Sequence, residues 1–209
     1  PVGYLEKIRE ICDKHGMLLV FDEVITGFGR MGTPFATQKF NVKPDIITMA
    51  KAITNGAIPM GAVAVTDEIY DTVTNASPEG AIEFFHGYTY SAHPAACAAG
   101  IATQKLYEAD ALFENAANLE EYFLDAIYTL KDHPLVTDIR GIGMMAGVEV
   151  ASDGVPGHRG GEMQKAMFWN GLHVKWTGDN AIVAPAFIAE RKHVDEIVDK
   201  FRKTLDEMM

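Results

Sequence analysis

The sequence predicts an α/β fold, in which a mainly parallel sheet is flanked by helices and followed by a smaller α+β domain. Two observations support this prediction. Continuous apolar runs, typical of strands buried on both faces of a parallel sheet, lead directly into Asp22 and close to Lys51. From about residue 110 the pattern changes to a long amphipathic helix with short strands after it. We therefore expect one domain over 1–109 and a second over 110–209.

The remaining elements of the first domain follow from local signals. Residues 4–15 place aliphatic side chains on one helical face opposite charged ones, and His15-Gly16 provides a stop. Pro94 opens an alanine-rich helix, at a position where the missing N–H of proline leaves no hydrogen bond unmade. The expected order is a helix at 4–15, strands at 17–21, 46–50 and 61–65, a helix at 67–75, a loop at 76–92 and a helix from 94.

The second domain is expected to mix helices with short strands. Arg140-Gly141-Ile142-Gly143 is interpreted as a turn that feeds a strand, with glycine supplying backbone freedom. The expected order is a long helix from about 110, a strand at 144–150, a Gly/Pro loop at 152–161, a helix at 162–170, two short strands near 172–184 and a terminal helix at 190–208.

Composition and charge exclude several classes of protein. Of the 209 residues, 48% are hydrophobic and 22% are charged, which is ordinary for a folded globular chain and not for a disordered or fibrous one. The net charge of −11 repels phosphate backbones and anionic lipids, so neither nucleic acid nor a membrane surface is an expected partner. The two cysteines, Cys12 and Cys97, provide neither a disulfide framework nor a CxxC metal pair, and we expect a cytoplasmic protein.

Asp22 and Lys51 are the candidate catalytic residues, because ligands of α/β sheets bind beyond the carboxyl ends of the strands. A lysine at the end of an apolar strand is expected to be partly desolvated, which favours the neutral amine that attacks carbonyl groups. Each residue taken alone also has a structural interpretation. Lys51 is then a side chain that reaches solvent from the sheet, and Asp22 is a helix cap.

Three segments of the sequence, taken together, extend this interpretation. They read LLVFDEVITGFGR at 18–30, PDIITMAK at 44–51 and HGYTYSAHP at 86–94. In this order and spacing they resemble class III aminotransferases, which are pyridoxal 5'-phosphate (PLP)-dependent enzymes of fold type I, and the resemblance covers essentially the whole chain. Within that class, TNGAIPMGAV at 54–63 is most similar to ω-amino acid:pyruvate (β-alanine:pyruvate) transaminases.

The resemblance implies a role for each matching residue. Lys51 holds PLP covalently and then acts as the base that moves a proton between substrate and cofactor. Asp22 faces the pyridine nitrogen and keeps it protonated, and Val24 packs on the ring. Thr89 gives its hydroxyl to the cofactor phosphate, across a subunit interface. Without the family context, Val24 is equally well interpreted as a core residue and Thr89 as a turn residue.

The resemblance also implies the organisation of the protein. Residues 1–109 correspond to the latter part of the large PLP-binding domain and 110–209 to the small C-terminal domain. The expected enzyme transfers an amino group from an ω-amino acid or amine to pyruvate or a similar keto acid, as a homodimer or tetramer. The family's phosphate-binding turn and the aromatic residue that stacks on PLP have no match here, and the chain begins with Pro1. We therefore expect a piece of a longer protein.

One position departs from the family pattern. The substrate carboxylate is usually bound by an arginine in a V-R-aromatic strand before a Gly-Asp turn, whereas this strand reads HVKWTGD at 173–179. Lysine is a point charge and lacks the planar two-bond grip of arginine on a carboxylate. Lys175 therefore leaves three alternatives open: weaker carboxylate binding, binding of another acid such as the sulfonate of taurine, or no role in binding.

Two further patterns point to other kinds of site. The motif GFGRMG at 27–32 follows a strand and matches a dinucleotide fingerprint, but Asp22 and Glu23 lie where pyrophosphate has to approach. His86 and His93 lack the spacing and the third ligand of a metal site, so no metal is expected.

Tyr88 and Tyr90 are expected to line either the cofactor or an aromatic core or interface.

Several alternatives to a transaminase remain open. Lys51 and Asp22 do not determine which substrate bond breaks, so another PLP enzyme of the same fold, an aminomutase or a decarboxylase, is an alternative. The alternatives outside PLP chemistry are a nucleotide-dependent dehydrogenase and a non-catalytic domain.

Overall fold

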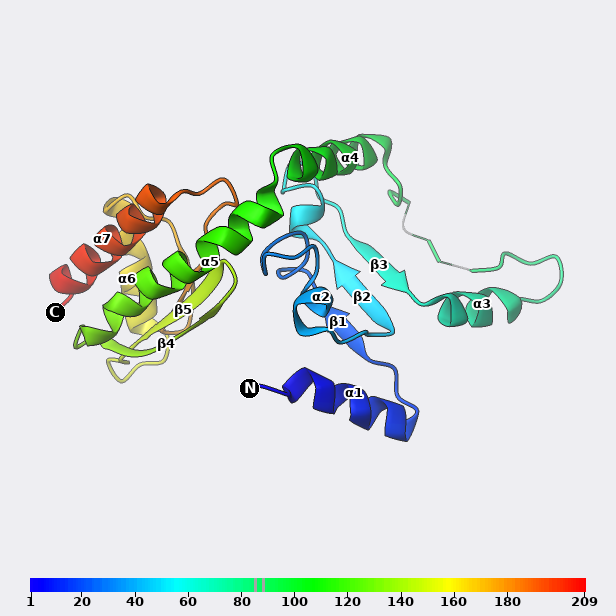
Figure 1. Cartoon of the computed structure of the whole chain (residues 1–209), viewed down its shortest axis with the longest axis horizontal. Helices are drawn as coiled ribbons and strands as arrows, with labels where there is room; N and C mark the ends of the chain where they lie inside the picture. Colours follow the sequence, from blue (N-terminus) through cyan, green and yellow to red (C-terminus); the bar gives the residue numbers. More distant parts are fainter. Residues whose placement is uncertain (85, 88) are drawn as a thin grey trace. The chain divides into compact units, whose positions relative to one another are not determined.

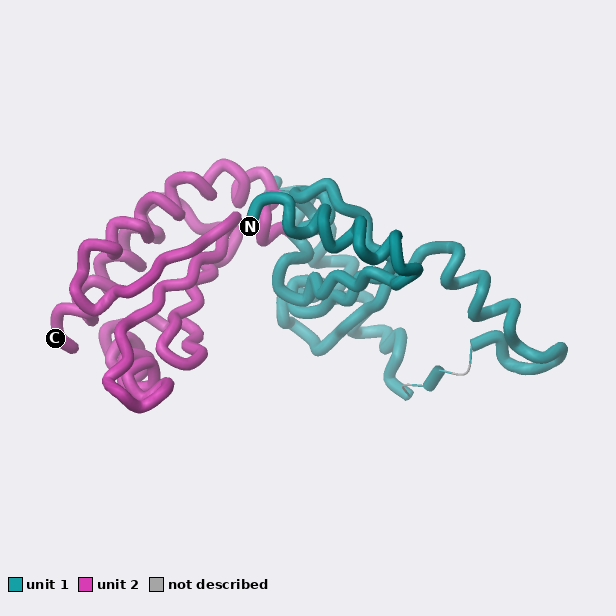
Figure 2. The backbone as a smooth tube through the Cα atoms, turned by 90° about the horizontal axis from the view of Figure 1, so that it is seen from below, with its two compact units in different colours: residues 1–28, 33–111 teal, residues 29–32, 112–209 magenta. Residues whose placement is uncertain are grey.

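The structure is a computed structural model that describes residues 1–84, 86–87 and 89–209. It divides into two compact units, which are coloured separately in Figure 2. Unit 1 comprises Pro1–Phe28 and Thr33–Ala111, and unit 2 comprises Gly29–Gly32 and Leu112–Met209. The short segment Gly29–Gly32 thus belongs to unit 2, although it lies far from the rest of that unit in the sequence.

Unit 1 contains a three-stranded sheet. Its strands, in spatial order, are β1 (Val20–Asp22), β2 (Ile46–Met49) and β3 (Ala62–Val65) (Figure 1). β1 and β2 are parallel, with Asp22 opposite Thr48. β3 is antiparallel to β2, so the expectation of a mainly parallel sheet is wrong for this pair. The chain between them forms only a 3-10 helix (Lys51–Ile53) and turns, and lacks the α-helical crossover that usually precedes a parallel strand.

The helices of unit 1 follow local sequence signals. They are α1 (Tyr4–His15), α2 (Ala36–Phe40), α3 (Asp67–Asn75) and α4 (Pro94–Ala109). α1 ends at Gly16, whose φ of +62° suits glycine, and α4 has proline in its first turn. The helices predicted at 4–15 and 67–75 are confirmed. The five-residue helix α2 was not indicated by the sequence.

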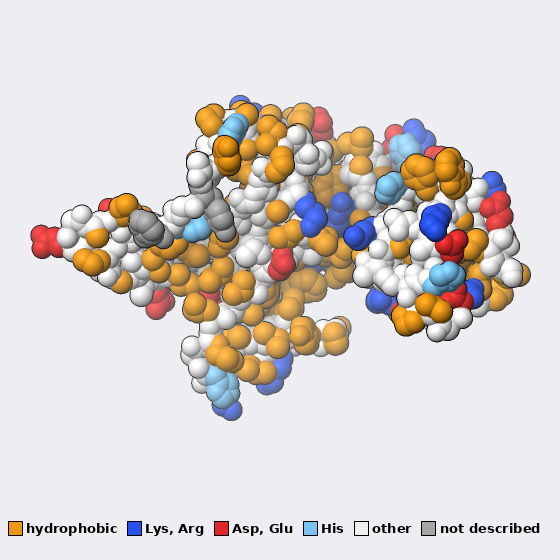
Figure 3. Space-filling view, turned by 180° about the vertical axis from the view of Figure 1, so that it is seen from behind, with side chains coloured by type: hydrophobic (Ala, Val, Ile, Leu, Met, Phe, Trp, Pro, Cys, Tyr) orange, Lys and Arg blue, Asp and Glu red, His pale blue; other side chains and the backbone are white. Residues whose placement is uncertain are grey.

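The apolar strands of unit 1 are less buried than their sequence predicts. The buried cluster of this unit consists of Cys12, Leu19 and Val42. Val20 is 51% exposed and Val63 is 65% exposed, so burial on both faces is wrong for β1 in this chain. Hydrophobic side chains also reach the surface on α3 and on the loop that follows it (Figure 3). They include Tyr70, Val73, Ile82 and Phe84.

Unit 2 is built on a four-stranded antiparallel sheet in the order β4-β5-β7-β6. Its elements are α5 (Leu112–Tyr128), a 3-10 helix (Thr129–Asp132), β4 (Val136–Ile142), β5 (Met145–Val150), α6 (His158–Trp169), β6 (Lys175–Thr177), β7 (Asn180–Val183) and α7 (Arg191–Glu207). Alternate residues of β5 are buried, as in a strand with one face on a core. Phe123, Met163 and Phe201, from three different helices, are fully buried in that core.

The expectation of a turn at 140–143 is wrong for most of that segment. Residues 140–142 belong to β4 and pair with β5. Only Gly143 has the positive φ of a turn, at +60°. Glycine inside a strand obscured the pattern, and here it permits a close approach, because a Cβ on Gly141 would lie 2.5 Å from Cδ2 of Leu124.

The described residues form neither a membrane-spanning helix nor a cluster of metal-binding side chains. Over the described ranges, no helix is both long and apolar enough to cross a membrane. The same ranges hold no group of three or more His, Cys, Asp or Glu side chains arranged to bind a metal ion.

Candidate active site

Asp22 and Lys51 lie at the same edge of the sheet of unit 1. Asp22 is the last residue of β1, and Lys51 is two residues beyond the end of its parallel neighbour β2. Ligands of α/β sheets bind at this kind of edge. Asp22 Oδ1 accepts the backbone N–H of Val24 at 3.0 Å and the hydroxyl of Thr48 at 3.4 Å. The Asp22 carboxylate is therefore oriented by a backbone group just after β1 and by a side chain of β2.

Lys51 adopts a strained backbone conformation. Its φ is +45°, in the left-handed region that non-glycine residues seldom occupy, and strain of this kind concentrates at functional sites. The sequence predicted partial desolvation of Lys51, whereas its side chain is exposed in this chain. Within the described residues, its ammonium group makes no hydrogen bond or ion pair and is available to a ligand.

Glu23 has the opposite environment from Asp22. It is 1% exposed and accepts the backbone N–H groups of Ala36 and Thr37, both at 2.9 Å, and the hydroxyl of Thr26 at 2.5 Å. The carboxylate thus satisfies N–H groups at the start of α2 that have no partner within the helix. This role of Glu23 was not predicted from the sequence. The pattern that could have indicated it is the alternation of side chains along a strand, which places Asp22 and Glu23 on opposite faces of the sheet.

The glycine motif at 27–32 contributes to packing in unit 2. A Cβ on Gly32 would lie 2.9 Å from the Cα of Ala117 in α5, so only glycine permits this approach. Arg30 donates a hydrogen bond to the carbonyl oxygen of Met144 at 2.9 Å. The motif continues in turns and opens no helix, so it lacks the helix N-terminus that a dinucleotide fingerprint uses for pyrophosphate.

The other predicted cofactor residues also belong to unit 1. Val24 is half-buried at the sheet edge, two positions after Asp22. Thr89 is exposed in the loop before α4, and the residues after it, Tyr90–His93, line a cavity together with Met49 at the end of β2. Tyr90, in the same loop, is 82% exposed and therefore belongs to no core of this chain. Tyr88 lies outside the described residues.

Lys175, the predicted substrate residue, lies in unit 2 as the first residue of β6. It is exposed, whereas Val174 and Trp176 on either side are each 7% exposed. This pattern matches the alternation of side chains along a strand. Lys175 therefore presents its ammonium group on the face of β6 that is turned away from the core of unit 2.

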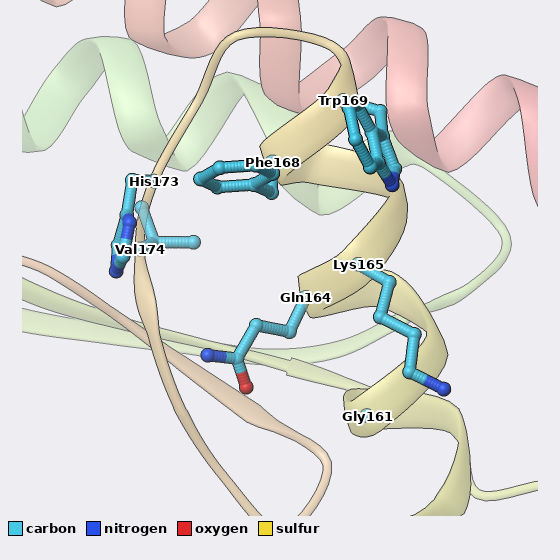
Figure 4. A pocket seen from close by; sticks show the side chains of 7 residues that line it. All are labelled: Gly161, Gln164, Lys165, Phe168, Trp169, His173 and Val174. Carbon is cyan, nitrogen blue, oxygen red and sulfur yellow. The ribbon is translucent and has the colours of Figure 1, made fainter.

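A cavity of about 380 Å³ lies between α6 and the segment before β6. Its lining includes Phe168, His173 and Val174. In Figure 4 the Phe168 ring points toward the other two, whereas Lys165 points away from them. The rings of Phe168 and His173 meet edge to face, with their centroids 5.9 Å apart. Lys175 is not among the lining side chains, so the cavity contains none of the predicted site residues.

Comparison with known proteins identifies the family to which the chain belongs. The chain matches the family described as Aminotransferase class-III over residues 1–205. An omega-aminotransferase of Caulobacter vibrioides is 49% identical over 209 residues, which are 100% of this chain and 47% of the relative. A beta-alanine--pyruvate aminotransferase of Pseudomonas aeruginosa is 45% identical over 208 residues, which are 99% of this chain and 46% of the relative.

A solved structure agrees with these matches. The (S)-enantioselective omega-transaminase from Thermomicrobium roseum superposes with a TM-score of 0.92 at 38% identity, covering 100% of this chain and 47% of that one. The chain thus spans about half the length of the proteins it matches. The resemblance inferred from the three sequence segments is confirmed, and the chain belongs to the class III aminotransferase family.

Proposed function

We propose that this chain is the C-terminal portion of a PLP-dependent aminotransferase, which transfers an amino group from an ω-amino acid or amine to pyruvate or a similar keto acid. The names of the two curated relatives, an omega-aminotransferase and a beta-alanine--pyruvate aminotransferase, support this choice of reaction. The observation that carries the proposal is the sheet edge of unit 1. There the Asp22 carboxylate ends β1, and the amine of Lys51 lies two residues beyond the adjacent parallel strand β2.

The side chains of unit 1 fit PLP by their chemistry. Its aldehyde requires a primary amine, its ring nitrogen a carboxylate that favours the protonated form, and its phosphate a set of hydrogen-bond donors. Lys51 supplies the amine, Asp22 supplies the carboxylate, and Thr89 supplies one hydroxyl. When bound, PLP provides the electron sink for bond breaking at the substrate carbon that carries the amino group.

Each residue has a distinct task in the proposed reaction. The Lys51 amine would hold the cofactor and would serve as the base that accepts and returns the proton of the substrate carbon. Asp22 keeps a negative charge beside the ring nitrogen and so holds a proton there. Val24 packs on the ring. Thr89 donates its hydroxyl to the phosphate, in a homodimer or tetramer where it reaches the neighbouring subunit's cofactor.

Lys175 is proposed to bind the acidic group of the substrate. Its ammonium group is exposed on β6, and a lysine attracts an anion as a point charge without selecting for planar geometry. A sulfonate is therefore accommodated as well as a carboxylate. In this proposal 1–109 form the latter part of the large PLP-binding domain and 110–209 form the small domain.

Trapping of the cofactor tests the proposal. Borohydride reduction of the full-length protein with PLP, followed by peptide mapping, is expected to place the label on Lys51. Lys51→Ala is expected to abolish both the visible absorbance of bound PLP and the formation of alanine from pyruvate, because the anchoring amine and the base are lost together. A donor panel of β-alanine, taurine and a simple amine then identifies the acidic group that Lys175 accepts.

The matched control is Lys14→Ala, which removes an exposed lysine from the last turn of α1. It is expected to leave absorbance and turnover unchanged. Labelling of a different lysine, or turnover by the Lys51→Ala protein, contradicts the proposal.

A further inference from the structure

The strained turn that carries Lys51 is bound to the neighbouring helix α4 by side chains. The hydroxyl of Tyr107 donates a hydrogen bond to the carbonyl oxygen of Ala52 at 2.8 Å. The side-chain amide of Gln104 donates to the carbonyl oxygen of Ile53 at 3.3 Å. Both carbonyls belong to the 3-10 helix that begins at Lys51. Helix α4 therefore holds the backbone directly after the proposed reactive lysine.

The same turn is also fixed by its own hydrogen bonds. The Lys51 carbonyl accepts the N–H groups of Thr54 at 3.3 Å and of Gly56 at 3.2 Å. The hydroxyl of Thr54, a residue that is 1% exposed, donates to the carbonyl of Ile58 at 2.6 Å. A strained φ such as that of Lys51 persists only where the surrounding structure over-determines it. The internal bonds and the bonds from α4 together supply that constraint.

One face of α4 lies close to the turn that carries Lys51. Its buried residues have the spacing of a single helical stripe, and they are Ala96, Gly100, Thr103 and Tyr107. At Gly100 a Cβ would lie 3.6 Å from the carbonyl oxygen of Ile53, so the helix backbone runs close to the turn. Tyr107 is the aromatic residue of the stripe and is 5% exposed. Its hydroxyl bonds to a half-buried carbonyl, and a polar group left without its partner at such a depth is destabilising.

We propose that Tyr107 is a positioning residue for Lys51 and acts through the carbonyl oxygen of Ala52. The proposal rests on the proposed function, since that function assigns the reacting amine to Lys51. Tyr107 bonds to the backbone of the turn, and the turn keeps Lys51 in its strained conformation at the sheet edge. Reacting groups need to be held within a fraction of an ångström. Loss of the hydroxyl is therefore expected to slow the steps that Lys51 performs while leaving substrate affinity unchanged.

The test is Tyr107→Phe in the full-length protein, which removes one hydroxyl and keeps the ring in the core. Hydrogen exchange of the apoprotein is expected to be about tenfold faster at the amides of Thr54 and Gly56, the effect of losing one hydrogen bond that holds the turn. In the protein loaded with PLP, kcat is expected to fall about tenfold with KM for the amino donor unchanged. The pH titration of the visible absorbance of lysine-bound PLP is expected to shift, because the Lys51 amine moves.

The matched control is Tyr70→Phe, which removes a hydroxyl from a tyrosine of α3 that is 61% exposed. Gln104→Ala is a second variant, and its effects are expected to be smaller because its bond is longer and exposed. If Tyr107→Phe lowers only the unfolding temperature, with exchange at the turn and the pH titration both unchanged, Tyr107 is merely structural and the proposal is overturned.

The same experiments separate this proposal from the proposed function. If borohydride labels a residue other than Lys51 in the unmodified protein, the proposed function fails and the positioning role fails with it. If Lys51 is labelled but Tyr107→Phe changes neither exchange at the turn nor the titration, the positioning role alone fails.

Discussion

Units 1 and 2 differ in the size of their buried cores and in whether they carry the residues proposed for catalysis. In unit 2, α5, α6 and α7 pack with the sheet around fully buried side chains such as Phe123 and Phe201. In unit 1 the buried cluster is small, and Val63 of β3 is 65% exposed. The amine and the carboxylate proposed to react nevertheless both lie in unit 1, as Lys51 and Asp22.

The residues expected to stabilise the chain therefore lie mainly in unit 2, whereas the residues proposed for catalysis lie in unit 1. Unit 2 buries a contiguous core, so large-to-small substitutions there are expected to change stability. Unit 1 relies on hydrogen bonds between side chains and backbone groups beside the positions proposed to carry chemistry. Glu23 holds the start of α2, and Tyr107 holds the turn after Lys51. Substitutions in unit 1 are therefore expected to change the geometry of the groups that these hydrogen bonds hold. They are expected to lower the stability as well where the substituted residue is buried.

The largest expected effect on stability lies in the core of unit 2. Phe201→Ala removes a fully buried ring, and we expect the free energy of unfolding to fall by about 3–5 kcal/mol. Phe168→Ala is the matched control in the same unit, because Phe168 is 56% exposed, and the expected loss is no more than about 1 kcal/mol. Denaturant unfolding followed by circular dichroism measures both. Equal losses would show that this core does not stabilise unit 2.

The next effect is on turnover and arises in unit 1. Asp22→Asn removes the negative charge proposed to face the ring nitrogen and is expected to lower kcat about 10²–10³-fold, as loss of one charge-stabilising group typically does. PLP binding is expected to persist, because Lys51 remains. The free energy of unfolding is expected to change less than in a variant of Glu23, because the Asp22 carboxylate is exposed in this chain whereas Glu23 is 1% exposed. Steady-state kinetics and denaturant unfolding of the full-length protein measure both quantities.

Glu23→Gln, the adjacent variant, is the control with the opposite expectation. It weakens the acceptor for two backbone N–H groups in a site that is 1% exposed, and we expect a loss of about 1–3 kcal/mol in the free energy of unfolding. A large loss of turnover in Glu23→Gln together with normal turnover in Asp22→Asn would reverse the roles assigned to the two carboxylates.

The features that the sequence predicted are those determined by local signals. Pro94 marks the start of α4, and Gly16 follows the end of α1, because each residue has a backbone preference that acts at its own position. The candidate pair was predicted in the same way. Asp22 and Lys51 each follow an apolar run, and the parallel pairing of β1 with β2 then puts them at one edge.

The features that the sequence missed depend on distant partners. The direction of β3 is set by the geometry of its connection to β2, which the residues of β3 do not encode. Arg140 lies in a strand because β5 pairs with it, despite the glycines on that stretch. Tyr107 has no local sign of its contact, because that contact is with a carbonyl 55 positions away. Contacts of this kind have no signature in the local pattern.

The smallest expected effect depends on pH and concerns the ion pair that ties α1 to the sheet of unit 1. Asp45 Oδ2 accepts hydrogen bonds from Arg9 Nη1 at 2.8 Å and from the backbone N–H of Leu19 at 2.6 Å. The Arg9 guanidinium, and next the Leu19 N–H group, lower the pKa of the Asp45 carboxyl below its ordinary value of 3.8. A unit with so small a buried cluster is expected to register the loss of this link.

The sign of the pH dependence follows from the lowered pKa of Asp45. Its contribution to stability is fully present above pH 3.8 and is lost as the pH falls through the lower pKa of the folded state. Asp45→Asn is therefore expected to lower the unfolding midpoint in denaturant at neutral pH, and the difference from the unmodified protein is expected to shrink in acid. Asp13→Asn, which removes a more exposed partner of the same Arg9, is the matched control and is expected to have a weaker effect. If the Asp45→Asn difference stays constant from neutral pH into acid, the carboxylate charge does not stabilise unit 1.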